Sequence, residues 1–533
     1  KDGHVRICLL AKRQWRALFQ WMGSPEEFAD PRFDIIAHRY KSDTLLPAIT
    51  RFFADKTRSE IEAQGQALGI PLAGLASLAN TLTNEQAVAR KSFRNIALTD
   101  ELTLPLPDGL IEIDGERAGI AGPIDSPQNK IEWRPRSETP ALQWADMSSD
   151  RPLAGLRVLD LGVIVVGAEQ GRLLADQGAD VIKIENPAFP DGARQTRSKT
   201  AMSPSFAAGH RNKRSLSLDL KSAQGRAILL EMIGSADVLL SNFKPGTLDS
   251  LGLDEATLRE ANPRLVMADS SAFGASGPWS KRMGYGPLVR AATGLTQLWR
   301  YSDDPTSWAD GLTVYPDHVA GRIGVIGVLA LLIRRATTGV GGRASTSQME
   351  VMLSHLATDI AATALAKRGK PVAEDGMPEF PVVSACQGDD EWCVVDPQNT
   401  LELEALADLV GQSADLPDAV RQWTAKRTPM DASSILQTAG VTAAPMLRVQ
   451  DMPDFSYFQQ RHFFSPIDHP ELEERYATEN APVASRNLPD PPARPAPTMG
   501  QHSREVIKHW TMRDEAEIDA LEAAGTIGGS VLI

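Results

Sequence analysis

One aspartate at the start of a long apolar run is well placed to act as a nucleophile. Asp317 lies two residues before Val319, where an apolar run begins that extends to Ile333. The run predicts a helix, and the helix dipole favours an ionised carboxylate in its first turn. An ionised carboxylate can attack an acyl group and carry a covalent intermediate. Asp is also a preferred helix cap, so position alone leaves a purely structural role open.

Three loops combine small or amide residues with basic side chains. They are Val165-Val166-Gly167, Arg211-Asn212-Lys213-Arg214 and Asn242-Phe243-Lys244-Pro245-Gly246. Glycine lets a ligand approach backbone N–H groups, and lysine and arginine can pair with phosphates. Together the loops suit a nucleotide-like ligand, although each alone is also an ordinary exposed loop. No Gly-x-Gly-x-x-Gly pattern follows the first predicted strand, so the usual dinucleotide fingerprint is absent.

Alternating strand and helix patterns surround these loops. Apolar runs predict strands at 156–161, 180–185, 215–220, 238–243 and 264–270, and helical patterns predict helices at 169–177, 222–233 and 248–261. Strands that alternate with helices indicate a parallel sheet covered on both faces, with a ligand crevice at the carboxyl ends of the strands. We therefore predict an α/β fold and expect the chemistry in the loops that follow its strands.

Composition narrows the class of protein. The 533 residues suggest two to four domains, and the net charge of −13 with no basic stripe argues against a nucleic-acid partner. The apolar run from Val319 is too short to span a bilayer and contains Arg322, so we expect a buried helix and no membrane partner. Three cysteines without a Cys-x-x-Cys motif indicate a reducing, cytoplasmic compartment. The histidines have no metal-ligand spacing, so we expect no metal site.

Two distant stretches of the chain resemble each other at a constant offset of 371. The matched positions are Gly69-Ile70-Pro71 with Gly440-Val441-Thr442, Ala73 with Ala444, Arg90 with Arg461, and Phe93 with Phe464. Chance similarity between helix-rich segments is the alternative explanation. We interpret the match as an internal repeat, which makes the chain part of a tandem protein. Because the chain begins with a strand-like segment and no signal pattern, we expect an upstream part to be missing.

Ordered blocks across residues 152 to 500 resemble the class III coenzyme A transferases, the CaiB/BaiF family that includes formyl-CoA transferase. The blocks are Leu153 to Asp160, Gly178 to Glu185, Asn212 to Lys221, Asn242 to Gly246, Gly274 to Pro278, and Asp317 with Gly321 before a helix that ends at Arg334 to Gly339. The resemblance implies a Rossmann-like large domain with a parallel sheet, a smaller α+β domain, and subunits that interlock as ring-like dimers.

The resemblance also implies a division of the chain. Residues 1–130 would be the small-domain part of an upstream copy, and 131–151 a linker. Residues 152–384 would form the large domain, 385–465 the small domain, and 466–533 a return to the large domain with a C-terminal tail. In a tandem protein the two halves could interlock within one polypeptide. The expected partner is therefore a second copy of the chain or its missing upstream half.

The implied reaction moves CoA from an acyl-CoA donor to a carboxylic acid acceptor, with Asp317 as the covalent nucleophile. The aspartate attacks the thioester to give a mixed anhydride, and the CoA thiolate returns to give an aspartyl-CoA thioester. CoA and acyl-CoA are substrates, and no tightly bound cofactor is implied. Matching motifs place the CoA contacts at Val165, Val166, Asn186, Leu218, Asp219, Leu220, Lys221, Asn242, Phe243, Lys244 and Tyr285.

Several positions depart from formyl-CoA transferase. Ser250 and Asn186 stand where that enzyme has phosphate-facing arginines, so Arg211, Lys213 or Lys221 could hold the phosphates instead. Gly286 follows Tyr285 where that enzyme has an acid. These departures argue against oxalate and formate chemistry, and we expect a larger, less polar acid.

Three other functions remain open at the level of the sequence. An acyl-CoA racemase or epimerase would need a histidine near Tyr285, where none stands, although His318 beside Asp317 could serve as its base. A CoA-dependent lyase built on a transferase step would have the same residues. A catalytically silent CoA-binding half of a tandem assembly would not need to retain Asp317.

Overall fold

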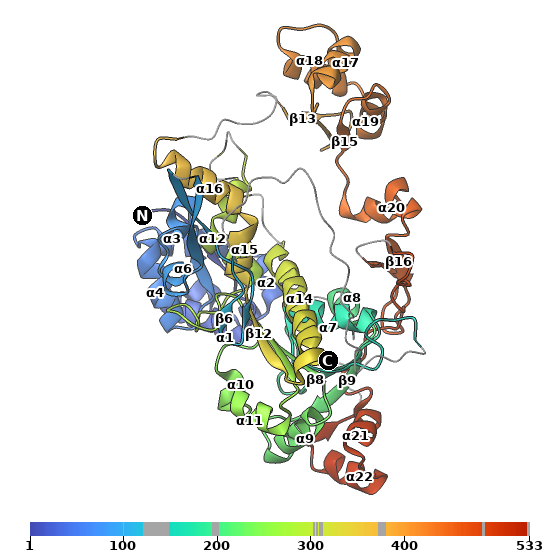
Figure 1. The fold of residues 1–533 in the computed structure, drawn as a ribbon. Coiled ribbons are helices and arrows are strands. Elements are labelled where there is room, and N and C mark those ends of the chain that lie inside the picture. Colours follow the sequence, from blue (N-terminus) through green and yellow to red (C-terminus); the bar gives the residue numbers. More distant parts are fainter. Residues whose placement is uncertain are drawn as a thin grey trace. The chain divides into compact units, whose positions relative to one another are not determined.

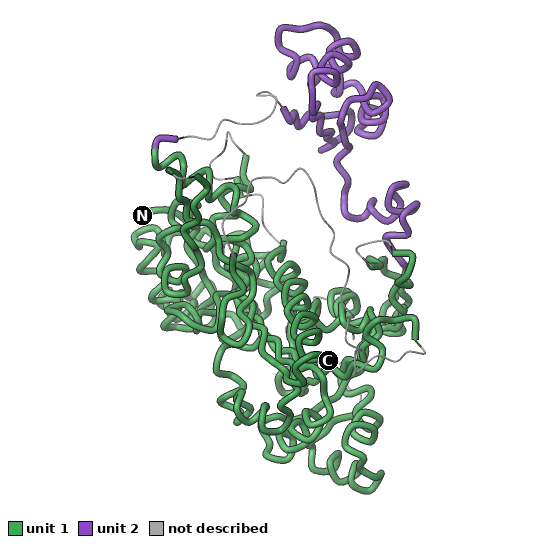
Figure 2. Tube along the Cα trace, in the orientation of Figure 1, with its two compact units in different colours: residues 1–368, 466–533 green, residues 369–465 purple. Residues whose placement is uncertain are grey.

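The computed structural model describes residues 1–99, 101–120, 149–194, 202–301, 304, 307–308, 313–370, 380–481 and 485–529. The chain divides into two compact units. Unit 1 contains residues 1–368 and 466–533, and unit 2 contains residues 369–465 (Figure 2). Most of the predicted linker, 131–148, lies outside the described residues. The predicted interpretation of residues 1–130 as part of an upstream copy stays a prediction.

Unit 1 is built on a nine-stranded sheet with the order β18-β9-β8-β7-β10-β11-β12-β5-β6. Its six central strands are parallel: β9 (Arg214–Leu218), β8 (Asp180–Glu185), β7 (Arg157–Asp160), β10 (Val238–Ser241), β11 (Val266–Ser271) and β12 (Gly342–Ser347). The antiparallel edge strands are β18 (Ile527–Gly528), β5 (Glu112–Ile113) and β6 (Glu116–Arg117). The predicted α/β fold with a parallel sheet is therefore confirmed.

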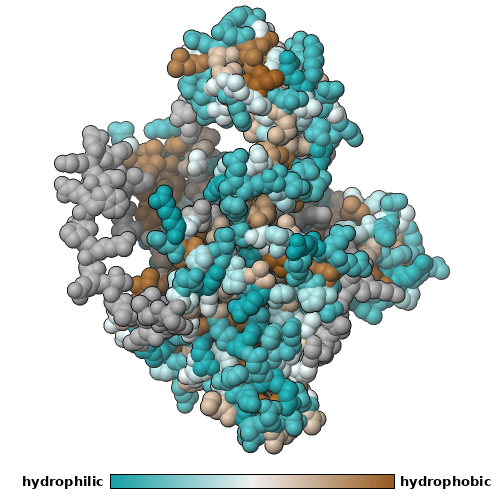
Figure 3. All heavy atoms as spheres, turned by 90° about the vertical axis from the view of Figure 1, so that its right-hand side faces the viewer, coloured by the Kyte–Doolittle hydropathy of each residue, from teal (hydrophilic) through white to brown (hydrophobic). Residues whose placement is uncertain are grey.

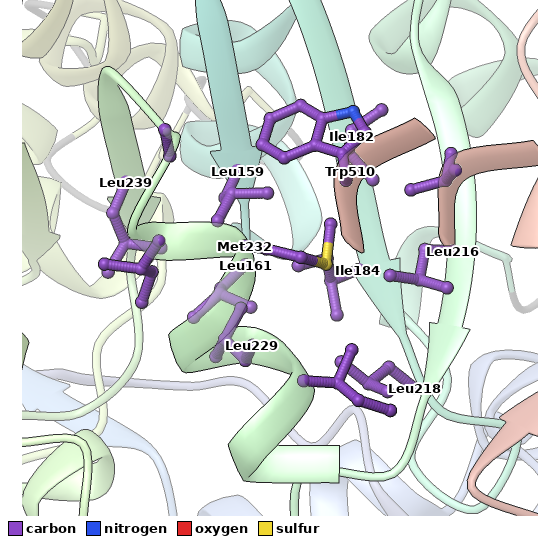
Figure 4. Close-up of a cluster of buried hydrophobic side chains, with 14 of the residues drawn as sticks. Leu159, Leu161, Ile182, Ile184, Leu216, Leu218, Leu229, Met232, Leu239 and Trp510 are labelled. Carbon is purple, nitrogen blue, oxygen red and sulfur yellow. The ribbon is translucent and has the colours of Figure 1, made fainter. Parts of the chain in front are cut away.

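Helices cover both faces of this sheet because successive strand residues point to opposite sides. On one face, α7 (Ile164–Asp176) and α14 (Tyr315–Thr338) pack on Val158, Val238 and Val266 (Figure 1). On the other face, α9 (Ala223–Ile233), α21 (Ser503–Thr511) and α22 (Glu515–Ala523) enclose a second apolar core. Figure 4 shows this core, in which Met232 and Trp510 lie among strand leucines and isoleucines.

The helix predicted at 248–261 is two helices, α10 (Thr247–Ser250) and α11 (Glu255–Ala261). Gly252 separates them with φ +71°, a conformation that most side chains avoid, and Asp254 caps the new start by accepting from the Thr257 N–H. The periodicity of the apolar residues continues across both helices, so the break is not visible in the pattern.

The predicted buried helix is α14, but it is not buried on all sides. Ile326 is 57% exposed and Ile333 is 60% exposed. Gly321, Gly324 and Gly327 lie at intervals of three on the inner side, where added Cβ atoms would overlap side chains of α7 and β12. The glycines therefore let α14 approach the sheet closely and place its first turn against α7. No helix among the described residues is long and apolar enough to cross a membrane.

Residues 1–99 form a lobe of unit 1 with its own aromatic core around Trp15, Phe28 and Phe33. Its main elements are β1 (Val5–Ile7), α1 (Lys12–Trp21), α3 (Leu45–Phe53), α4 (Arg58–Ala67), β2 (Leu72–Gly74), α6 (Glu85–Ala89) and β3 (Phe93–Thr99), which pairs with β4 (Leu102–Pro107). The lobe packs through β1 and β2 on α12 (Gly286–Thr293). Arg90 of the lobe also pairs with Glu350 on α15 (Gln348–His355), which precedes α16 (Ala357–Ala366).

Unit 2 contains a three-stranded sheet covered on one face by helices. The strands are β13 (Val382–Ala385), β14 (Trp392–Val395) and β15 (Ala443–Pro445), and the covering helices are α17 (Thr400–Val410), α18 (Leu416–Thr424) and α19 (Pro429–Thr438). Further along lie α20 (Ser456–Gln460) and β16 (Phe464–Ile467), which is followed in unit 1 by β17 (Tyr476–Glu479). Four elements of residues 1–99 have counterparts here whose bounds are shifted by 371: α3 corresponds to α18, α4 to α19, β2 to β15, and α6 to α20. The two segments thus share element order and spacing.

Candidate active site

Asp317 is the third residue of α14, at the start of the helix as predicted, and it lies beside the carboxyl ends of β10 and β11. Its side chain is buried, with only 8% of the residue exposed. It lines a cavity of about 260 Å³ together with residues from the ends of β10 and β11 and from the start of α7. Burial raises the pKa of Asp317 to about 6, against an ordinary value of 3.8, because the ionised form loses its hydration. The carboxylate is still mostly ionised at neutral pH.

The two carboxylate oxygens of Asp317 have different surroundings. Gln348 Nε2 donates to Oδ1 at 3.4 Å, and the backbone N–H of Gly286 also helps to stabilise the ionised form. Oδ2 is buried without a hydrogen-bond partner among the described residues. A Cβ atom added to Gly286 would lie 2.1 Å from Oδ2. Glycine at this position therefore leaves room for the carboxylate.

The turn before α7 is held by two side chains from neighbouring elements. Asn242 accepts from the Val163 N–H at 2.7 Å and donates to the Val163 carbonyl at 2.8 Å. Asp191 accepts from the Ile164 N–H at 2.9 Å and is itself paired with buried Lys183. Ile164 has φ +56°, which is strained for a β-branched residue. These hydrogen bonds with Asn242 and Asp191 hold the turn and the first residues of α7 beside Asp317.

A second cavity of about 310 Å³ adjoins the first, because Val163 and Phe243 line both. Its exposed surface is mainly apolar, and its polar lining residues are Glu185, Asn186, Asp191, Asp219, Lys221, Thr247 and Ser250. Asn186 donates to Asp219 at 3.0 Å, and the Lys221 ammonium lies 3.8 Å from the centre of the Phe189 ring. An apolar cavity with a few polar groups suits a planar, nucleotide-like moiety, with the Asp317 cavity at its reactive end.

The structure distributes the predicted contact residues over the two cavities. The Asp317 cavity is lined by Val165, Asn242, Phe243, Lys244 and Tyr285. The adjoining cavity is lined by Asn186, Leu218, Asp219, Leu220, Lys221 and Phe243, and also by Ser250. Val166 is buried and lines neither of them. Asn242 reaches the cavity edge, but its side-chain hydrogen bonds go to Val163.

The suggestion that Arg211 or Lys213 binds phosphates is wrong. Both side chains are buried and paired internally: Arg211 with Asp176 at 2.7 Å, and Lys213 with Asp160 at 2.8 Å. Neither lines the two adjoining cavities. The basic run at 211–214 therefore supports the fold beneath the site. Lys221 lines the second cavity, so the suggestion that it binds phosphates stays a prediction.

Residues 1–99 contribute to the Asp317 cavity. Arg13 lines it, and Gln14 Nε2 donates to the Tyr285 hydroxyl at 3.3 Å. Partial burial lowers the pKa of Lys244, with smaller contributions from the neighbouring charges of Arg13 and Lys281. The cavity mouth is therefore positively charged, which favours an anionic ligand. No motif around Arg13 could identify it, because it lies about 300 positions before Asp317 in the sequence.

His318, the candidate base of a racemase, lies outside this cavity. Its side chain is half exposed, and Nδ1 lies 3.2 Å from Glu169 Oε2. No histidine among the described residues lines the Asp317 cavity or the adjoining one. The residue that does approach Asp317 is Gln348, which the sequence analysis missed because a glutamine after a serine cap carries no catalytic signature.

Comparisons with known proteins agree with this geometry. The model of "CoA-transferase family III" matches residues 1–127 and 153–503. The chain is 39% identical to "Probable CoA-transferase Rv1866" of Mycobacterium tuberculosis, over 95% of this chain and 67% of that protein. It is 27% identical to "Succinyl-CoA--D-citramalate CoA-transferase" of Chloroflexus aurantiacus, over 71% of this chain and 98% of that one.

Solved structures show the same fold. A CAIB/BAIF family protein from Brucella suis superimposes with a TM-score of 0.58 at 24% identity, covering 68% of this chain and all of that one. The family model covers both the lobe of residues 1–99 and the segment that carries Asp317. The chain therefore belongs to CoA-transferase family III.

Proposed function

We propose that this chain transfers CoA from an acyl-CoA to a carboxylic acid through an aspartyl-CoA thioester on Asp317. The observation that carries the proposal is the buried carboxylate with one unpartnered oxygen, Oδ2, facing a cavity that continues into an apolar, nucleotide-sized one. A poorly hydrated carboxylate with a raised pKa is more basic than one in water, and therefore a better nucleophile.

The reaction would proceed in four substitutions at acyl carbon. Oδ2 attacks the donor thioester and expels the CoA thiolate, which leaves an acyl-aspartyl anhydride. The thiolate attacks the aspartyl carbonyl, expels the donor carboxylate and leaves the aspartyl-CoA thioester. The acceptor carboxylate then attacks this thioester, and the thiolate released attacks the acceptor acyl group to regenerate Asp317. Each step exchanges one bond for another, so no external oxidant or reductant is needed.

The two cavities would divide the substrate between them. The second cavity, with Asn186 and residues 218–221, suits the nucleotide end of CoA, and the cavity beside Tyr285 and Lys244 suits the thioester end. Arg13 and Lys244 at the mouth favour phosphate or carboxylate groups. The racemase alternative is less well supported, because His318 is paired with Glu169 outside both cavities.

Intact-protein mass spectrometry after incubation with a panel of acyl-CoAs tests the proposal. Succinyl-CoA is a suitable first donor because a relative is named for it. We expect a CoA adduct on the wild-type protein that hydroxylamine removes, and no adduct on Asp317→Ala. Asp254→Ala, a change at a half-buried helix cap that lines neither cavity, is the control and should keep the adduct. An adduct that persists in Asp317→Ala would contradict the assignment. Tight CoA binding without an adduct from any donor would favour a racemase or a silent half.

A further inference from the structure

Four buried polar atoms of residues that line the Asp317 cavity have no partner among the described residues. They are Asp317 Oδ2, Gln348 Oε1, Ser270 Oγ and Ser271 Oγ, and the first three belong to residues that are buried as a whole. These three residues are 8%, 5% and 1% exposed. Asp317 Oδ2 is accounted for as the nucleophile. Gln348 Oε1 and Ser270 Oγ have no role in the proposed reaction, yet leaving a buried polar atom unpaired costs about 1–3 kcal/mol.

The ends of two neighbouring strands bring these side chains together. Ser270 lies on β11, on the same face as Val266 and Ala268, and that face packs on α14. Gln348 begins α15 directly after β12, which is paired in parallel with β11. Gln348 contacts the Asp317 carboxylate, and Ser270 lines the same cavity. The arrangement is set by the sheet and does not depend on a loop.

The contact with Asp317 fixes the orientation of the Gln348 amide. An ionised carboxylate requires a donor, so Nε2 faces Asp317 Oδ1 and Oε1 is directed elsewhere. Oε1 can only accept a hydrogen bond. An ionised carboxylate of the substrate cannot donate one, and neither can a hydrocarbon chain. The group that Oε1 lacks is therefore a hydroxyl or an amide N–H.

We propose that Gln348, together with Ser270, forms a subsite beside Asp317 that accepts a neutral hydrogen-bond donor of the bound substrate. The inference rests on the proposed function and specifies the substrate at that site. The donor can come from two sources: a hydroxyl on the acyl group, or the pantetheine amide nearest the thioester. The first source makes the enzyme selective for hydroxy acids. A site built to pair with a hydroxyl discriminates strongly against an analogue that lacks it, because its own polar atom then stays unpaired.

The test compares hydroxyacyl-CoAs with unsubstituted acyl-CoAs of equal chain length. The wild type should show a kcat/KM about 10- to 100-fold higher for a 2-hydroxy or 3-hydroxy donor. Gln348→Met has nearly the same length but no amide, and should reduce this preference to within about threefold. Gln170→Met is the matched control, because Gln170 is equally buried and unpartnered on α7 but does not line the cavity. It should keep the wild-type preference.

The outcomes distinguish the two sources of the hydrogen-bond donor, and they test the Gln348 subsite separately from the transferase function of Asp317. If Gln348→Met lowers kcat/KM equally on both substrates and also binds CoA more weakly in calorimetry, the pantetheine amide is the donor. If Gln348→Met lowers kcat/KM equally on both substrates but leaves the affinity for CoA unchanged, the subsite is overturned, and Gln348 serves only to hold Asp317. Unchanged activity of Gln348→Met on both substrates would also overturn it. The CoA adduct on Asp317 is followed in parallel: if it forms while Gln348→Met changes neither the preference nor the affinity for CoA, the subsite is wrong and the transferase proposal stands.

Discussion

Asp317 is held in an environment that disfavours its own ionised form. The folded protein raises its pKa to about 6, whereas an unfolded chain would titrate near the ordinary value of 3.8. Folding therefore favours the protonated carboxyl. Below about pH 4, Asp317 does not lower the free energy of unfolding. The protein loses stability as the pH rises from about 4 to about 6, and above that range the full destabilisation by the ionised carboxylate is present. Reactivity at this residue is gained at the expense of stability.

Asp317→Asn should therefore stabilise the protein while abolishing transfer. The amide is neutral at every pH, so the gain should be largest above pH 6 and should shrink towards pH 4, with at most about 3 kcal/mol available. Thermal unfolding at pH 7.5 and at pH 4.5 measures it. Asp254→Asn serves as the control, since Asp254 is a helix cap and asparagine caps equally well. A variant less stable than wild type at pH 7.5 would show that the carboxylate has a stabilising partner.

At the level of elements, α15 links the reacting residue to the lobe of residues 1–99. Gln348, at its first position, contacts Asp317, and Glu350, two residues on, accepts from Arg90 through both oxygens at 3.0 and 2.8 Å. Arg117 and Ser92 complete the network at 2.7 and 2.6 Å. Contacts with these arginines and Ser92 hold the pKa of Glu350 below its usual range despite burial. The orientation of Gln348 thus depends on a residue from the beginning of the chain.

Glu350→Ala should destabilise the protein by about 3–5 kcal/mol, because it leaves the buried Arg90 with Glu112 as its remaining carboxylate partner among the described residues. Transfer activity should also fall at temperatures where the variant is folded, because α15 loses its anchor. The stabilisation by Glu350 is present above its unfolded pKa near 4.5 and is lost as the pH falls through the lowered folded value. Urea unfolding and steady-state kinetics measure the two effects.

Arg504→Ala is the control for Glu350→Ala, since Arg504 pairs with several carboxylates at the surface, where ion pairs contribute little. If Glu350→Ala unfolds at the same urea concentration as this control, the buried network does not hold the lobe in place.

The sequence predicts the main elements well and the site only in part. The strand predicted at 180–185 has those bounds in the structure, because β-branched Val181, Ile182 and Ile184 between two helical segments are a strong local signal for a strand. The N-terminal placement of Asp317 follows from the apolar run and is also confirmed. The sequence could not predict Arg13 or the Arg90–Glu350 pair, because these residues reach the site region through contacts across 190 or more positions. It could not predict Gln348, because its role depends on how its side chain is oriented at the edge of the sheet. The burial of Arg211 and Lys213 is a tertiary effect of the same kind.

At the level of the whole molecule, equivalent surfaces of the two similar segments differ in their burial. Ala73 on β2 is 2% exposed because the β1–β2 pair packs on α12, whereas Ala444 on β15 is exposed. Arg90 is buried against Glu350, whereas Arg461, its counterpart at the same offset, is exposed. Unit 2 therefore presents the surface that the lobe of residues 1–99 uses to pack on a large domain.

The outer face of the sheet of unit 2 is apolar as well as exposed. Val383 is 60% exposed, and Trp392 and Val394 are each 36% exposed, while the alternate residues of the same strands are buried beneath α17, α18 and α19. Apolar side chains are visible as brown spheres at the surface of this unit in Figure 3. An exposed apolar sheet face is typical of a surface that another protein segment covers.

We expect this face to pair with another copy of the large domain, so the protein should associate in solution and its measured mass should exceed 57.7 kDa. Val394→Asp places a charge in the middle of the face and should restore the monomer, because burying an unpaired carboxylate in an interface is unfavourable. Val449→Asp is the control: Val449 is 82% exposed in the same unit but lies outside the sheet, so this change should leave association intact. Light scattering across a concentration series measures the mass. A wild-type chain that stays at 57.7 kDa throughout would rule out this pairing between copies of the chain, and the face would then need a different large domain to cover it.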